Sequence, residues 1–228
     1  MDVVTQYLES SEPSNSEHLW RYTPWKRVHP LGSFSKMPDS VIFPKAKLSY
    51  LDGTKVNEIH LEKSELNQNL NKNEPDISAS FIRALCGGVC YRLIIPKNTS
   101  LEQPLFLDLN VSGYVSAFHL IIENMSHSKI ELITSIQGDA EWFGLLREGK
   151  LESSSSFSDL LVNNMNVSST FLRAENFILQ NNTEMNSATL SLGGSNCKSD
   201  IRGLIQGKGV NYNQRIAMHG IEKRNDDI

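Results

Sequence analysis

The feature that most constrains this chain is a long series of short strand-like runs after Gly87-Gly88. About ten runs rich in β-branched and aromatic residues follow one another at intervals of roughly 8–14 residues, which is typical of an all-β sandwich, barrel or solenoid. They cover residues 90–96, 104–111, 117–124, 129–136, 156–162, 168–174, 176–181, 187–194, 199–206 and 212–218.

The connections between these runs favour a solenoid. Several of them lack Asn-Gly or Asp-Gly, the dipeptides that mark tight hairpins. Residues 123–128, 179–187 and 193–199 contain Asn, Ser and Gly instead. Such corners turn the chain gently from one strand to the next without reversing it. We therefore predict an all-β fold in which the chain winds into a β-helix.

The first part of the chain has a different character. Prolines keep any helix within the first 35 residues short. Trp20, Tyr22 and Trp25 lie close together, which suits a tail that packs on another surface. Helices are expected over 64–71 and, from apolar residues at helical spacing, over 77–85. The predicted division is an N-terminal region with short helices and an aromatic-rich tail over 1–85, and β-helix coils over 86–228.

Composition excludes several functional classes. The chain has 228 residues, 39% hydrophobic and 21% charged, so it can bury a core. The net charge is -4, and no basic stripe indicates nucleic-acid binding. No long apolar run predicts a membrane span, and the first residues do not resemble a secretory signal. Three cysteines suit a reducing compartment. We expect a cytoplasmic protein, or a plastid one in a photosynthetic eukaryote.

The three thiols do not predict a metal site. Cys86 and Cys90 form the motif Cys-Gly-Gly-Val-Cys, and only Cys197 remains elsewhere. In extended structure, Cys86 and Cys90 are too far apart for a disulfide unless the backbone bends. An iron–sulfur cluster usually takes four ligands. The favoured interpretation is small buried residues beside a Gly-Gly turn, with no metal ligand among them.

Histidines and carboxylates do not predict a catalytic centre either. His119, His127 and His219 show no metal-ligand spacing, and no Gly-x-Ser-x-Gly elbow is present. β-Helical enzymes that cleave polysaccharides use acidic clusters, so a carbohydrate-active enzyme is kept as an alternative. Its candidate carboxylates are Asp108, Glu123, Asp200, Asp226 and Asp227. The favoured expectation is a protein that is not an enzyme and has no catalytic residue.

Several stretches together resemble the SufB/SufD family of iron–sulfur cluster assembly scaffolds. The segment Trp20-Arg21-Tyr22-Thr23 resembles the element with which SufD-type chains open. Residues 84–105 resemble the family's Ala- and Gly-rich approach to a Val-Pro-Lys-Gly strand pair. Leu192-Gly193-Gly194 with Asp200 and Gly207-Lys208-Gly209 resembles a coil motif of the family, and Met218-His219-Gly220 with Asp226-Asp227 resembles its later turn. The Trp-Arg-Tyr-Thr element favours a SufD-like chain.

The resemblance implies a right-handed parallel β-helix preceded by a small, mostly helical N-terminal region. It also implies a scaffold subunit that binds SufB-like and SufC-like partners. Such a subunit is expected to bind no cofactor stably and to meet an iron–sulfur cluster only through the complex. Cofactor-binding residues are therefore unassigned. No nucleic acid or membrane is expected as a partner.

The resemblance also has a departure. The family continues with more coils and a helical segment that grips SufC, where this sequence ends at Ile228. We therefore expect the β-helix to be incomplete at its C-terminal end and the SufC contact to be lost. A divergent SufB-like cluster carrier, which would use Cys86, Cys90 or Cys197, is a further alternative.

Overall fold

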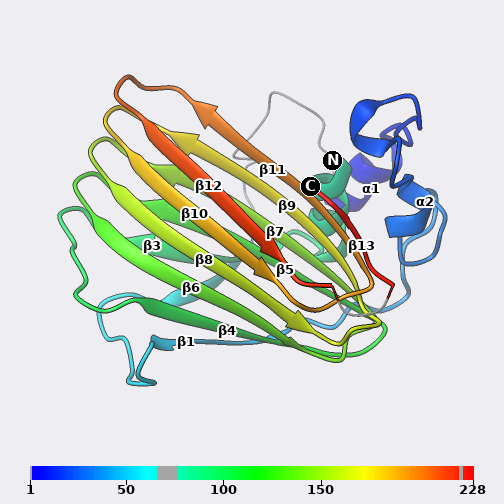
Figure 1. Ribbon diagram of the computed structural model, residues 1–228, viewed down its shortest axis with the longest axis horizontal. Helices are drawn as coiled ribbons and strands as arrows, with labels where there is room; N and C mark the ends of the chain where they lie inside the picture. The colour runs from blue at the N-terminus through cyan, green and yellow to red at the C-terminus, as the bar shows by residue number, and fades with distance from the viewer. Residues whose placement is uncertain (1, 66–76, 221–222) are drawn as a thin grey trace.

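A computed structural model of the protein describes residues 2–65, 77–220 and 223–228. The chain winds into a β-solenoid of about 5 turns, with 50% of residues in strands and 10% in helices. Two sheets of mainly parallel strands face each other and enclose the core, and a small helical N-terminal part lies beside one of them (Figure 1). The predicted fold class, a parallel β-helix after a small helical region, is confirmed.

The two sheets are built from alternate strands of the chain. Among the described residues, sheet B has the order β1(Lys45–Tyr50), β4(Leu105–Val111), β6(Lys129–Gly138), β8(Ser156–Met165), β10(Glu184–Ser191) and β12(Asn211–Met218). Sheet A has the order β13(Asn225–Asp227), β11(Asn196–Ile205), β9(Thr170–Leu179), β7(Trp142–Leu151), β5(Val115–Asn124), β3(Val89–Ile95) and β2(Leu61–Glu65). Each full coil therefore takes one strand from each sheet.

The coils stack in a nearly constant register. Val115 lies opposite Trp142, Trp142 opposite Thr170, and Thr170 opposite Asn196. One coil therefore takes about 27 residues, within the range of solenoid repeats. The edges are different: β1 and β2 pair antiparallel with β4 and β3, although both come from the region before residue 85. Thus the N-terminal region adds a strand to each sheet as well as its helices.

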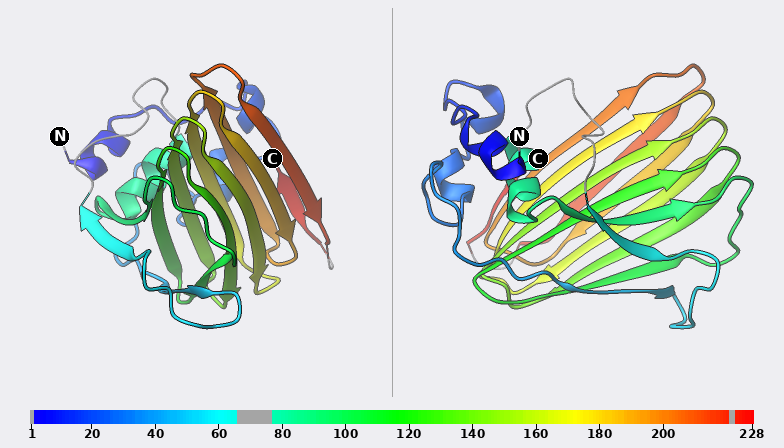
Figure 2. Two further views of the ribbon diagram at one scale, coloured as in Figure 1. Left: turned by 90° about the vertical axis from the view of Figure 1, so that its left-hand side faces the viewer. Right: turned by 180° about the vertical axis from the view of Figure 1, so that it is seen from behind.

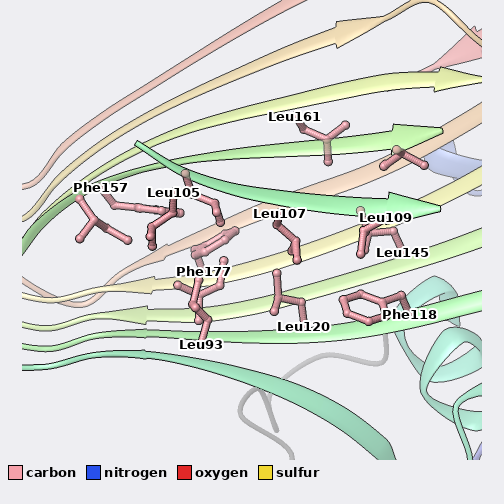
Figure 3. Packing of buried hydrophobic residues seen from close by; sticks show 14 of the residues in the cluster. Leu93, Leu105, Leu107, Leu109, Phe118, Leu120, Leu145, Phe157, Leu161 and Phe177 are labelled. Atoms are coloured by element: carbon pink, nitrogen blue, oxygen red, sulfur yellow. The ribbon is translucent and has the colours of Figure 1, made fainter. Parts of the chain in front are cut away.

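The core fills the space between the sheets. Along β4, β6 and β8, buried and partly exposed residues alternate, because successive side chains of a strand point to opposite faces. The inward residues form one apolar cluster, drawn in Figure 3, that includes Leu107, Phe118, Leu120, Leu145 and Phe157. Stacked rows of Leu and Phe from successive coils thus remove apolar surface from water, which is the main driving force for this fold.

The helical part covers the outer face of sheet A. It consists of α1(Val3–Leu8), the 3₁₀ helix η1(His18–Trp20), α2(Trp25–Val28) and α3(Ile77–Leu85). Figure 2 shows these helices on the side of sheet A that faces away from sheet B. A second apolar cluster fills the contact, with Trp25 and Phe81 from the helices and Trp142 and Leu146 from β7. Strands β5, β7 and β9 are consequently buried on both faces.

The predicted elements match most of the observed ones. The helix expected over 77–85 is α3. All ten predicted runs overlap observed strands: eight correspond to separate strands, and the runs 168–174 and 176–181 belong to one continuous strand, β9. Strand β7 was not predicted, because Arg147, Glu148 and two glycines interrupt its apolar pattern. Of the helix expected over 64–71, residues 64 and 65 belong to β2, and the rest lies outside the described residues.

The corners between strands rely on residues that tolerate a left-handed backbone. Asn98, His127, Ser154 and Asn182 have φ between 54° and 62°. Gly138 has φ of 127°, and a Cβ atom there would lie 2.0 Å from the carbonyl oxygen of Val111 in the preceding coil. Only glycine fits such an approach. The polar corners of the sequence are therefore solenoid corners, as predicted.

Candidate functional site

The largest group of buried charges lies inside the solenoid, between β7, β8 and β9. Both Nη atoms of Arg147 donate to Asp159, at 2.8 and 2.7 Å, and its Nε donates to Glu175 Oε1 at 2.5 Å. Arg173 Nε donates to the same Glu175 oxygen at 2.6 Å. Arg147 and Arg173 are fully buried, and Asp159 is 4% exposed. We call these four residues the interior charge cluster.

Register explains why the interior charge cluster forms. Arg147 and Glu175 lie directly opposite each other on β7 and β9, both on the inward face. Burial alone would raise the pKa of Glu175, but the Arg147 and Arg173 guanidinium groups more than offset this and hold the pKa below its ordinary value. Two cations thus balance two carboxylates, which is the condition under which charges persist in a core.

Neutral polar groups surround the interior charge cluster. Arg173 Nη1 donates to Thr189 Oγ1 at 2.7 Å, and Ser187 Oγ donates to Asp159 at 3.3 Å. Arg173 Nη2, Glu175 Oε2 and Gln214 Nε2 are buried without a hydrogen-bond partner among the described residues. The cluster stabilises its own charges and is closed to solvent. It offers neither an accessible nucleophile nor an accessible general base.

A second buried ionic group fixes α3 to the outer face of sheet A. Glu148 of β7 accepts a hydrogen bond from Arg83 Nη2 at 3.0 Å and lies 2.8 Å from His119 Nε2. Burial lowers the pKa of His119, although Glu148 opposes this. Burial alone would raise the pKa of Glu148, but His119 and Arg83 together hold it below its ordinary value. These contacts join the helix to two neighbouring coils.

The Trp20–Thr23 element anchors the N-terminal region to the solenoid. Trp20 is 3% exposed and packs edge-on against Trp25, whereas Tyr22 is 73% exposed. Lys198 Nζ of β11 lies 5.1 Å from the Trp20 ring centroid and donates to Leu19 O at 2.7 Å. The aromatic tail therefore packs on a distant coil of the same chain, which is the kind of contact expected from the sequence.

The three cysteines are free and buried. Cys86 and Cys90 flank the turn at Gly87 and Gly88, whose φ values are 57° and 78°. Burial raises the pKa of all three thiols, and that of Cys197 reaches about 11. Because the thiolate is the form that binds metals, these thiols are poor ligands as they stand. Among the described residues, no group of three or more His, Cys, Asp or Glu side chains could hold a metal ion.

The three histidines considered in the sequence, His119, His127 and His219, do not form a cluster. His127 occupies a corner with φ of 60°, and His219 is exposed after β12. His119 belongs to the group beneath α3, so its role in the structure is to bind Glu148.

Each candidate carboxylate for a carbohydrate-active enzyme has a hydrogen bond or ion pair with another side chain. Asp200 pairs with Arg202, Asp226 with Arg224, and Asp227 with Lys198. Asp108 accepts from Gln137, and Glu123 binds Arg92. A glycosidase needs one carboxyl as acid and another as base or nucleophile. Each of the five candidates instead engages a basic or amide side chain, so the geometry does not single out such a pair among them.

Sequence reasoning missed the charged residues that the structure brings together. Arg83, Arg147, Glu148, Asp159, Arg173 and Glu175 come from one helix and three strands. One signal was available: the interval between the runs at 129–136 and 156–162 equals a whole coil, so a strand of sheet A was missing from the prediction. Arg147 and Glu148 lie in that gap, and the first faces the core whereas the second faces the helices.

Comparisons with known proteins leave the family open. No protein-family model matches the chain, and no curated protein matches it. In the part of the chain that the structure describes, no helix is long and apolar enough to cross a membrane. The SufD-like resemblance therefore rests on the residues quoted above and on the fold.

Proposed function

We propose that this chain is a SufD-like scaffold subunit in iron–sulfur cluster assembly, which acts by protein–protein interaction with a SufB-like subunit and, through it, with a SufC-like subunit. The observation that supports it most is the architecture: a parallel β-helix with a small helical N-terminal part packed on one sheet. The resemblance implies this arrangement. The buried charged side chains pair with one another, and burial raises the pKa of the thiols. The proposed function therefore depends on the surface of the protein, through which it would bind other subunits.

Three residues of the motifs that carry the resemblance have clear structural roles in the solenoid. Trp20 anchors the N-terminal region on β11, and Gly193 lies against the backbone of Met165 in the preceding coil, where a Cβ atom would meet the Met165 oxygen at 2.2 Å. Gly207 has the same role against Asn181. These positions specify coil geometry, which is what a family of scaffolds would retain.

The proposal includes no resident cofactor. Raised pKa values keep the three thiols protonated at neutral pH, so the chain itself would not ligate a cluster. Cluster association would then occur only through the complex. Anaerobic reconstitution with iron and sulfide should leave the isolated chain without visible absorbance. A cluster that depended on Cys86, Cys90 or Cys197 would favour the SufB-like alternative.

Co-purification tests the proposal directly. The tagged chain is co-expressed with the SufB-like and SufC-like subunits encoded in the same genome. The SufB-like subunit should be recovered with the tag, and the SufC-like subunit should be recovered only when the SufB-like subunit is present. A folded chain that retains neither subunit would refute the proposal. Circular dichroism of the same preparation establishes that the solenoid is folded.

A further inference from the structure

The outer face of sheet B is uncovered in the part of the chain that the structure describes. The helices cover sheet A, while no described element lies over the outside of β4, β6, β8, β10 and β12 (Figures 1 and 2). Partly exposed apolar side chains form a stripe across this face because alternate residues of each strand point outward. The stripe consists of Phe106, Ile133, Leu160, Val162, Ala188 and Leu190.

A shallow groove of about 430 Å³ lies on this stripe. Its floor includes Ile133, Leu160 and Ala188, which are neighbours in register on β6, β8 and β10. Glu131 of β6 lines one side and Arg215 of β12 the other. Both are exposed, and neither has a salt bridge within the described chain. The groove thus combines an apolar floor with a carboxylate on one side and a guanidinium on the other.

This pattern is self-complementary. A two-fold axis in the plane of the face, close to the strand direction and between β8 and β10, exchanges β6 with β12. It would place Glu131 of one copy beside Arg215 of the other, twice, with Leu160 and Ala188 of both copies at the centre. Isologous dimers are built from such patches, in which the same surface meets itself.

We propose that two copies of this chain associate face to face through the outer surface of sheet B. The size of the overlapping surface suits a dimer that dissociates on dilution. Strands about 4.8 Å apart and about 3.3 Å per residue give the four overlapping strands, β6, β8, β10 and β12, an area of about 500–600 Å². This lies at the low end of specific interfaces, below the ~800 Å² per partner of the standard size. Aligned packing of two sheets would bury the stripe as in a β-sandwich. The proposal is independent of the function proposed above.

Sedimentation velocity of the isolated chain over a dilution series tests this inference. The wild-type chain should form a dimer that dissociates on dilution. Leu160→Glu should weaken association at least about a hundredfold, because it would bury a carboxylate without a partner. Val167→Glu is the matched control: Val167 is 47% exposed at the corner after β8, so this variant should associate like wild type.

A charge swap makes the test specific for this geometry. Glu131→Arg and Arg215→Glu should each weaken the dimer by roughly tenfold, and the double variant should restore it, because the pair is re-formed with its signs reversed. The inference is overturned by a wild-type monomer at every concentration, by equal effects of Leu160→Glu and Val167→Glu, or by no recovery in the double variant. Loss of the dimer in Met218→Glu but not in Leu160→Glu would also overturn it and assign association to the exposed end of the last coil.

Discussion

The interior charge cluster predicts a large and specific cost for removing a single charge. Glu175→Gln keeps the shape of the side chain but leaves Arg147 and Arg173 facing one carboxylate, Asp159. One buried cation then lacks a counterion, and such a loss costs about 3–5 kcal/mol. For a chain of this size each kcal/mol lowers the melting temperature by about 2–4 °C, so the expected fall is about 6–20 °C.

A double-mutant cycle separates charge imbalance from lost packing. Arg173→Met alone leaves an excess of negative charge, and should destabilise the fold as Glu175→Gln does. The double variant restores neutrality around the Arg147–Asp159 pair, so its cost should fall short of the sum of the single costs by about 1–3 kcal/mol. Urea unfolding followed by far-ultraviolet circular dichroism at pH 7 measures all three values. Glu184→Gln on the exposed side of β10 is the matched control and should stay within about 0.5 kcal/mol of wild type.

Acidity supplies a second check on the same residue. The pKa of Glu175 lies below its ordinary value of 4.5, so its stabilising contribution is complete above that value and is lost as the pH falls through the lower folded-state pKa. Wild type and Glu175→Gln should therefore converge in stability at strongly acidic pH. The reasoning is refuted if Glu175→Gln unfolds like wild type at pH 7. It is also refuted if the destabilisation of the double variant equals the sum of the two single destabilisations.

Three further outcomes are expected. Burial lowers the pKa of His29 to about 4, so as the pH falls the unfolded chain takes up this proton before the folded chain does. The free energy of unfolding should therefore fall between about pH 6.5 and 4. In His29→Phe this decrease should be smaller, and an unchanged pH dependence would contradict the argument. Gly138→Ala should lower the melting temperature markedly because its Cβ atom would meet the Val111 carbonyl, whereas Gly220→Ala, with no atom closer than 3.7 Å, should not. Cys197 and the other two thiols should react with a disulfide reagent only after denaturation, and rapid reaction of any thiol in the folded chain at neutral pH would show that it is not buried.

Local patterns were enough to predict most of the solenoid. α3 follows from apolar residues at helical spacing between Ile77 and Leu85, and β4, β6 and β8 follow from alternation of buried and outward residues. The polar corners followed from their composition. Each of these signals lies within about ten residues, so it does not depend on how the coils stack.

The charged sites could not be predicted because they depend on coil register. Arg147 meets Asp159 on the opposite sheet and Glu175 one full coil later. Only the stacking of complete coils brings them together. The same holds for Glu148, whose partners Arg83 and His119 come from a helix and from the preceding coil. A strand with Arg and Glu side by side shows no apolar alternation, and that is why β7 was not recognised.

The interior charge cluster also limits how this solenoid can grow by coil duplication. A second copy of the β5–β6 coil would stack Leu120 on Leu120 and Leu132 on Leu132, an apolar layer that tolerates repetition. A second copy of the β7–β8 coil would bring its own Asp159 but would stack Arg147 on Arg147, so one of the two guanidinium groups would lose its contact with Glu175. A buried cation with fewer partners is costly. Insertions that lengthen the solenoid are therefore expected to cost less in its apolar coils than in the layer that contains the interior charge cluster.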